Sequence, residues 1–344
     1  MPRTIALSLS LILLACGGGD TTSTGSGGSG GSGAGTSSSG GSGATGGAAA
    51  AGGNGGMGTG AGGEGGSPFV DPLAGVGSVA AVSNGHQFTE GPVWLPAQGL
   101  LYFSDIPDEE VFTLDEANTL ATWTTTSGGT NGNALDVDGS LISCVQLDKR
   151  VIRHTDPQNP AAIEVVADQY GGLPFNRPND AIVRSDGSVY FTDPNYSGSQ
   201  SQPFQGVFHV APSGSVSLVD DAMDKPNGIA LSPDETVLYV TDAGSAELWT
   251  FAIASDGSVT PGSKAKLADT SPGPDGFAVD DQGYLYLSTA AGIDVHAPDG
   301  TLFGNLPVPQ QPANCTFGGS DRRTLYITAR QGLYAIHLNV PGLP

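Results

Sequence analysis

The chain has 344 residues and is strongly acidic: 34 Asp and Glu side chains against 12 Lys and Arg leave a formal net charge of −22. Phosphate binding requires clustered basic side chains, so this charge excludes nucleic acid as an expected partner. Of the 54 glycines, 25 lie in residues 17–67, between an apolar N-terminal stretch and a long segment of mixed composition. We therefore expect three segments, at residues 1–16, 17–67 and 68–344.

The first segment, MPRTIALSLSLILLAC, has the pattern of a secretory signal, with one positive charge at Arg3 followed by an apolar run. That run is shorter than the roughly 20 apolar residues that a membrane span needs. Its end, Leu13 to Cys16, resembles the lipobox of bacterial lipoproteins. The resemblance implies lipidation of Cys16 and an exported protein anchored to a bacterial membrane, on its periplasmic or cell-surface face. An ordinary cleaved signal with an incidental cysteine is the alternative.

Residues 17–67 have the composition of a linker, because glycine fills 25 of these 51 positions and most others are Ser, Thr or Ala. Such a segment cannot bury enough apolar surface to offset the entropy of ordering it. We expect a disordered tether with an end-to-end distance of roughly 40 Å. A cell-wall spacer or a plain low-complexity expansion would be equally disordered.

The third segment, residues 68–344, repeats one short motif six times. The motifs read TEGPVW, TNGNAL, RPNDAI, KPNGIA, GPDGFA and QPANCTF, and they align Glu90, Asn131, Asn179, Asn227, Asp275 and Asn314 at steps of 41, 48, 48, 48 and 39 residues. A period of about 40–50 residues is typical of one four-stranded propeller blade. The sequence therefore predicts an all-β, six-bladed propeller, with the six aligned side chains at one end of its axis.

The fourth repeat shows the expected strands most clearly. An apolar run at 228–231, a β-branched and aromatic run at 237–242 and an alternating run at 247–253 are separated by Pro, Asp and Gly turns. A β-sandwich has similar strands, but six nearly equal repeats favour a closed ring. We expect residues 68–87 to supply the strand that closes this ring, and the domain to be a monomer.

The aligned side chains offer carboxylate and carboxamide oxygens, while all five histidines, Cys144 and Cys315 lie elsewhere. Oxygen ligands with two carboxylates suit a hard cation such as Ca²⁺ or Mg²⁺, and a structural zinc site does not fit. Asn131 and Asn314 could instead be turn formers. Glu90 has no such structural reason to occupy its position. We expect the two cysteines to be buried free thiols.

A family resemblance adds to this interpretation. The segments EGPVW, RPND with YFTDP, KPNGIALSPDE, PDGFAVD and NCTFGG occur in this order and together resemble the gluconolactonase/regucalcin (senescence marker protein) family over residues 85–340. The resemblance implies a six-bladed propeller with one divalent metal at the channel mouth, usually calcium, with Mg²⁺, Mn²⁺ or Zn²⁺ as alternatives. It also implies a lactonase whose substrate is a sugar lactone such as gluconolactone.

Residue roles follow from the same resemblance. The implied metal ligands are Glu90, Asn227 and Asp275, with Asn179 close to both metal and substrate. Asp275 is also the implied acid/base, and Arg177 the implied substrate contact. Asp193 and Tyr196 of FTDPNY are expected in the pocket wall, with a strand-end turn as the alternative.

One position departs from the family pattern. Many bacterial gluconolactonases carry Cys-Glu-His where this chain has Cys144, Val145 and Gln146. The missing acid and imidazole predict a shifted substrate preference, toward a less polar lactone.

The expected chemistry is hydrolysis of a cyclic ester, in which the metal polarises the carbonyl and a carboxylate activates water. Arg177 would stabilise the developing anion. No Gly-x-Ser-x-Gly elbow is present, which disfavours a serine nucleophile. Two alternatives remain: a hydrolase of another ester or of a phosphotriester at the same site, and a non-enzymatic exported binding module, which would need neither Glu90 nor Asp275.

Overall fold

The computed structural model describes residues 69–343, and all the regular elements in this range are β-strands. None of these residues forms a helix that could cross a membrane. The predicted signal at 1–16, with Cys16, and the predicted tether at 17–67 lie outside the described residues.

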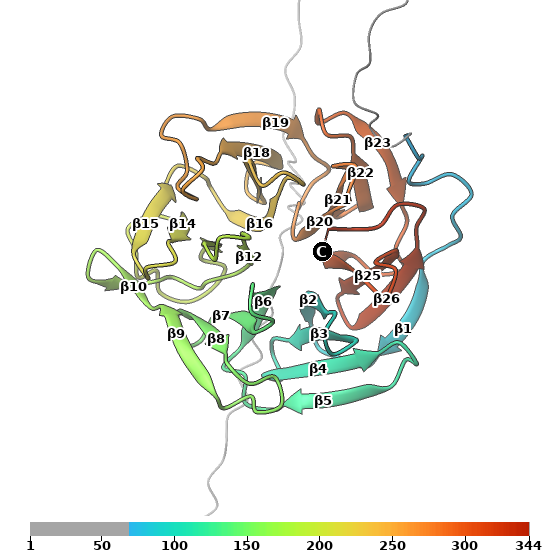
Figure 1. Ribbon diagram of the computed structural model, residues 1–344, viewed down its shortest axis with the longest axis horizontal. Helices are drawn as coiled ribbons and strands as arrows, with labels where there is room; N and C mark the ends of the chain where they lie inside the picture. The colour runs from blue at the N-terminus through green and yellow to red at the C-terminus, as the bar shows by residue number, and fades with distance from the viewer. Residues whose placement is uncertain (1–68, 344) are drawn as a thin grey trace, which may run out of the picture. The chain divides into compact units, whose positions relative to one another are not determined.

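Six four-stranded antiparallel sheets surround one axis as the blades of a propeller (Figure 1). In each blade the strand that contains or directly follows the repeated motif is the innermost one. The predicted six-bladed fold is therefore confirmed. The blades are β2 (Thr89–Leu95), β3 (Leu100–Asp105), β4 (Glu110–Asp115) and β5 (Leu120–Thr124); β6 (Thr130–Leu135), β7 (Leu141–Val145), β8 (Arg150–His154) and β9 (Ile163–Ala167); β12 (Ala181–Val183), β13 (Val189–Asp193), β14 (Gly206–Val210) and β15 (Val216–Asp220); β16 (Pro226–Leu231), β17 (Val237–Asp242), β18 (Glu247–Ala252) and β19 (Ala265–Asp269); β20 (Phe277–Val279), β21 (Leu285–Thr289), β22 (Gly292–His296) and β23 (Leu302–Leu306); and β24 (Pro312–Gly318), β25 (Thr324–Ala329), β26 (Gly332–His337) and β1 (Ala80–Asn84).

The ring closes between the two ends of the described chain. The strand β1 pairs antiparallel with β26, with Ala80 opposite Ala335, and so completes the sixth blade. The expectation that residues 68–87 close the ring is confirmed for this strand. Closure of this kind leaves no inner sheet edge free to pair with another chain. A short hairpin of β10 (Gln169–Tyr170) and β11 (Leu173–Pro174), which the repeat pattern does not predict, interrupts the connection into the third blade.

The core lies between neighbouring blades. Five of the six second strands place a tyrosine at the same position, and each ring is at most 7% exposed: Tyr102, Tyr190, Tyr239, Tyr286 and Tyr326. The second blade has Ile142 there instead, with no exposed surface. Each such side chain fills the space between two twisted sheets, and removing its surface from water stabilises the ring.

The last described residues lie at the end of the axis opposite the aligned ring, against the fifth and sixth blades. The Gly342 amide donates to the carbonyl of Arg322 in the sixth blade and its carbonyl accepts from the Arg322 guanidinium, while Leu343 donates to the carbonyl of Val279 in the fifth. Gly342 lies so close to Phe317 that a Cβ would approach its ring to 2.1 Å. This C-terminal tail (338–343) therefore links the fifth and sixth blades at the far end of the channel.

Candidate functional site

The fold brings the six aligned residues to one end of the axis, as the repeat predicts. Four of them lie within inner strands, while Asn179 and Asp275 come two residues before β12 and β20. Glu90, Asn131, Asn179, Asn227 and Asn314 are at most 6% exposed, and Asp275 is partly exposed. We call these six residues the inner ring.

Glycines allow the inner ring to be this tight. A Cβ on Gly91 would meet the carbonyl oxygen of Asn131 at 2.0 Å, and one on Gly276 would meet the Asn314 carboxamide at 1.9 Å. Gly91 also has a φ of +47°, which L side chains rarely adopt. In the four motifs that carry it, the glycine is thus required by the close approach of consecutive inner strands.

Hydroxyl groups on the second strands hold neighbouring blades in register at the inner ring. Ser104 donates to the carbonyl of Asn131 at 2.9 Å, and Thr241 donates to that of Asp275 at the same distance. Thr192 makes the corresponding bond to Asn227 at 2.6 Å. These buried bonds fix the backbone from which the ring side chains project.

Side-chain contacts connect members of the ring. The Asn314 side chain acts to lower the pKa of Glu90, and the Asn227 side chain acts to lower that of Asp275, so each amide lies close to its carboxylate. Burial raises the pKa of Glu90 well above its ordinary value, and the charge of Asp275 raises it further. Burial also raises the pKa of Asp275 to about 7, against the lowering effect of Asn227. Burial therefore disfavours the ionised forms of Glu90 and Asp275 in the absence of a bound cation.

Asp180 is a third carboxylate at this position, and the sequence analysis missed it. It is 6% exposed, and Asn314 Nδ2 lies 3.4 Å from its Oδ2. Burial raises its pKa to about 7. Asp180 occupies the place that glycine takes after Glu90, Asn131, Asn227 and Asp275, and this break in the repeat is the signal that could have identified it.

The donor set fits a hard divalent cation. The ring offers only oxygen ligands, and no group of three or more His, Cys, Asp or Glu in residues 69–343 is arranged as a metal cluster, so amide oxygens would have to complete the shell. Asn131 Oδ1 is buried and has no hydrogen-bond partner among the described residues, as expected of a ligand atom. Burial raises the pKa of both cysteine thiols, Cys315 to about 12, so neither is an available thiolate ligand. Both are buried and free, as predicted.

The other predicted site residues surround the ring differently. Tyr196 is partly exposed, and its hydroxyl accepts from Asn227 Nδ2 at 2.6 Å, which places it at the ring. Arg177 is partly exposed on the loop before Asn179, with Nε 2.8 Å from the carbonyl of Ser197. The two side chains therefore border the mouth on the third blade.

Asp193 has a different position, which corrects the expectation that it lines the pocket. It has no exposed surface, and its two oxygens accept from the backbone amides of Asn176 and Arg177 at 2.7 Å. Asp105 and Asp242 make the same pair of bonds in the first and fourth blades. Asp193 thus supports the loop that carries Arg177, in agreement with the strand-end alternative.

Val145, at the departure from the family pattern, takes the blade position of Asp105, Asp193 and Asp242. It is 1% exposed and packs against the Gly128–Gly129 loop, so it offers the mouth no polar group. Leu147, two residues on, is 52% exposed. A less polar side chain thus borders the mouth on the second blade.

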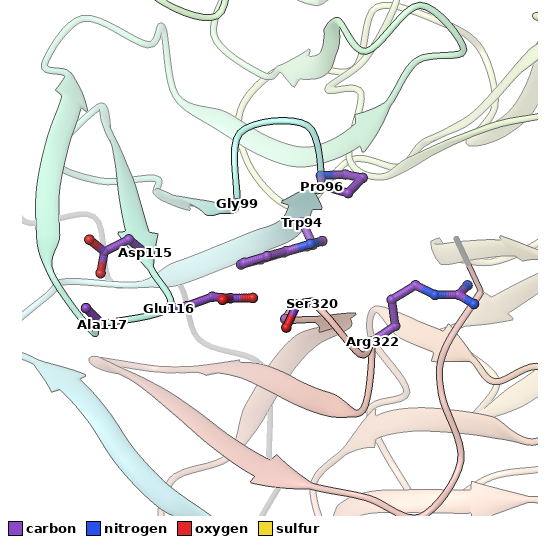
Figure 2. A pocket seen from close by; sticks show the side chains of 9 residues that line it. Trp94, Pro96, Gly99, Asp115, Glu116, Ala117, Ser320 and Arg322 are labelled. Atoms are coloured by element: carbon purple, nitrogen blue, oxygen red, sulfur yellow. The ribbon is translucent and has the colours of Figure 1, made fainter.

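Two cavities lie away from the mouth. One, of about 600 Å³, is the central channel beyond the ring, with apolar residues of the inner strands in its wall and Asp180 and Asn314 near the ring. The other, of about 740 Å³, lies between the first and sixth blades at the far end. Figure 2 shows its Trp94, Glu116 and Ser320. It contains no ring residue, so its residues cannot act on a substrate held at the ring.

Known proteins identify the family. The family model for the SMP-30/gluconolactonase/LRE-like region matches residues 88–331. The chain belongs to this family. A gluconolactonase from Zymomonas mobilis is 32% identical to this chain over 319 residues, which cover 80% of this chain and 86% of that protein. The structure of a gluconolactonase from Xanthomonas campestris matches at 31% identity with a TM-score of 0.72, covering 78% of this chain and 91% of that one. A calcium-binding regucalcin from Agrobacterium tumefaciens shares the fold, with a TM-score of 0.67 and 21% identity over 78% of this chain and 95% of that one.

Proposed function

We propose that this chain is a divalent-metal-dependent lactonase that hydrolyses a sugar lactone such as gluconolactone at the inner ring. Membership of the family and its lactonase relatives support a hydrolase acting on cyclic esters. The single observation that carries the finer proposal is the convergence of Glu90 and Asp275 with carboxamide oxygens at the channel mouth.

Glu90, Asn179, Asn227 and Asp275 would hold the metal, and the unpartnered oxygen of Asn131 extends the donor set. Calcium is the favoured ion because every donor is a hard oxygen and several are neutral amides. When bound, the cation supplies Lewis-acid polarisation of the lactone carbonyl.

The chain's own residues supply the proton transfer. Asp275 accepts a proton from water, the water oxygen bonds to the carbonyl carbon, and the acyl–oxygen bond of the ring breaks. The same proton then passes to the departing ring oxygen, which leaves as a hydroxyl group. Burial raises the pKa of Asp275 to about 7 in the metal-free protein, and a bound cation would stabilise its ionised form, which is the form that accepts a proton. Arg177 orients a substrate hydroxyl or stabilises negative charge on the oxygen.

The test is a hydrolysis panel on metal-stripped protein with Ca²⁺, Mg²⁺, Mn²⁺ or Zn²⁺ added back. The panel contains aldonolactones, an aryl ester and a phosphotriester, so each alternative activity is measured in parallel. We expect metal-dependent opening of an aldonolactone, lost in Glu90→Gln and retained in Glu116→Gln, which changes an exposed glutamate at the far end. Lactone opening no faster than the spontaneous rate with every metal would refute the proposal.

Lipid anchoring at Cys16 is a separate proposal, supported by the lipobox-like Leu13–Cys16 and the glycine-rich segment behind it. It places the enzyme outside the cytoplasm on a bacterial membrane. Cells fed a labelled fatty acid should incorporate label into the parent chain but not into Cys16→Ser. Equal labelling of the two chains would exclude this anchor.

A further inference from the structure

Basic side chains are few in this acidic domain, and about half of them are paired with carboxylates. Of the 12 Lys and Arg, all but Arg3 lie in residues 69–343, which leaves 11. Five of these form ion pairs with carboxylates: Arg150, Arg153, Arg184, Lys264 and Lys266. Arg322 and Arg323 donate to carbonyls of the C-terminal tail. The other four have no carboxylate within ion-pair distance in the described part of the chain.

These four cations lie at the end of the propeller that carries the inner ring. Lys149 follows β7 and Arg330 follows β25, while Arg177 and Lys225 each stand two residues before a ring asparagine. All four are partly exposed. We call Lys149, Arg177, Lys225 and Arg330 the basic rim.

Aromatic and neutral polar contacts hold the rim side chains in place. The Arg330 guanidinium lies 5.5 Å from the centre of the Phe88 ring, and it donates to Gln311 at 2.5 Å. The Lys225 ammonium lies 4.8 Å from the centre of the Tyr196 ring, whose hydroxyl contacts Asn227. Contacts of this kind fix a cation without neutralising its charge.

The rim charge exceeds what the ring needs. Arg330 lies within electrostatic reach of Asp275, so in the metal-free protein it partly balances the ring carboxylates. A bound divalent cation neutralises Glu90 and Asp275 by itself, which leaves Asp180 as the remaining carboxylate at the ring. The four rim cations then lie at this end without an ion pair, with Lys149 within electrostatic reach of the buried Asp193 and Arg330 within reach of Asp275.

We propose that the basic rim binds a lactone carrying an anionic group, such as a carboxylate, sulfonate or phosphate, at a position remote from the lactone carbonyl. Arg330 and Lys225 contact that group while the carbonyl lies at the ring. The physiological substrate is then an acidic sugar lactone, and not the less polar lactone that the sequence departure at Val145 and Gln146 predicts. This class rests on the proposed lactonase function. The exposed Leu147 borders the same mouth and contacts the carbon skeleton between the two ends.

The kinetic test compares gluconolactone with its analogue bearing a sulfonate at carbon 6. The sulfonate is chosen because, unlike a phosphate, it competes weakly for calcium. We expect kcat/KM for the sulfonate to exceed that for gluconolactone by about tenfold at low ionic strength, and the ratio to fall with added salt. A ratio near one while gluconolactone is opened would overturn the rim proposal and leave the lactonase proposal intact.

Variants assign the preference to the rim. Arg330→Gln and Lys225→Gln should each lower the ratio about threefold to fivefold, whereas Arg330→Lys, which keeps the charge, should largely retain it. The matched control is Lys266→Gln, which removes one charge from the outer strand β19, where Lys266 pairs with Glu247 and Asp269. An equal fall of the ratio in that control would attribute the preference to net charge and overturn the assignment.

A binding measurement decides the matter even if no lactone is hydrolysed. Calorimetry on the calcium-loaded parent should give about tenfold tighter binding of the open-chain sulfonated acid than of gluconate, with the difference reduced in Arg330→Gln. Equal affinities for the two acids would overturn the rim proposal. The phosphate and carboxylate analogues, measured the same way, identify which anion fits best.

Discussion

The two ends of the inner strands differ in chemistry although the same strands form both. At the mouth, the first residues of each motif are acids and amides held together at a cost of raised pKa values. Along the channel, later residues such as Leu95, Leu231 and Val279 are apolar and buried, and the C-terminal tail joins the fifth and sixth blades at the far end. The difference shows that a propeller separates function from stability along its axis, since packing at one end supports an unfavourable charge cluster at the other.

The largest expected effect is on catalysis at the mouth. Asp275→Asn keeps the size of the side chain and removes the proton acceptor, so kcat should fall about 10²–10⁴-fold while the fold persists. Steady-state kinetics with saturating calcium measures the loss, and circular dichroism verifies the fold. Asn314→Ala should lose less, because Asn314 moves no proton. An Asp275→Asn variant with parental kcat would assign the base elsewhere, with Asp180 as the first candidate.

A change at the far end should affect stability alone. Leu338 is 1% exposed in the cluster that joins the tail to the fifth and sixth blades. Leu338→Ala should lower the free energy of unfolding by about 2–5 kcal/mol through lost burial and a cavity. Denaturant unfolding measures this loss, and the calcium affinity of the folded variant should equal that of the parent. A large fall in affinity would show that the two ends are coupled.

The packing within the ring gives a smaller effect. A Cβ on Gly276 would overlap the Asn314 side chain, so Gly276→Ala should displace the ring and weaken calcium binding by about tenfold or more. Gly262→Ala is the matched control, because a Cβ there meets nothing within 4 Å, although its positive φ adds a local backbone cost. Unchanged affinity in Gly276→Ala would mean that the ring tolerates displacement.

The smallest expected effect is a pH dependence. The folded pKa values of Asp180 and Asp275 are about 7, above the unfolded values near 4, so the metal-free native state binds more protons between these values. Its stability should therefore fall as pH rises through this window. Calcium stabilises the ionised form, so the increase in Tm on adding calcium should be larger at pH 8 than at pH 5.5. The three histidines with lowered pKa titrate in the same range with the opposite sign, but the calcium-dependent difference removes their contribution. An equal increase at both pH values would contradict the raised carboxyl pKa values.

Much of this arrangement is predictable from sequence because each blade repeats the same constraints. The motif period predicts the blades, and the motif glycines predict the tight ring, since consecutive inner strands must approach closely there. Asp180 escapes a search on the aligned position because it lies one residue later, where only the third blade has an acid and the sixth has Cys315. The role of Asp193 could not be predicted either, because the sequence does not distinguish a carboxylate that binds backbone amides at a strand end from one that lines a pocket. The contacts of the C-terminal tail with the fifth and sixth blades are long-range, and no periodicity encodes them.

Calcium titration by calorimetry tests the central claim most directly. Metal-stripped parent protein at pH 7 should bind one Ca²⁺ at the ring and release protons, seen as heats that vary with the ionisation enthalpy of the buffer, because raised pKa values leave the ring carboxyls partly protonated. Glu90→Gln and Asp275→Asn should each bind more weakly, and Glu116→Gln should bind as the parent does. Calcium binding of parental strength in both ring variants would contradict the assigned site.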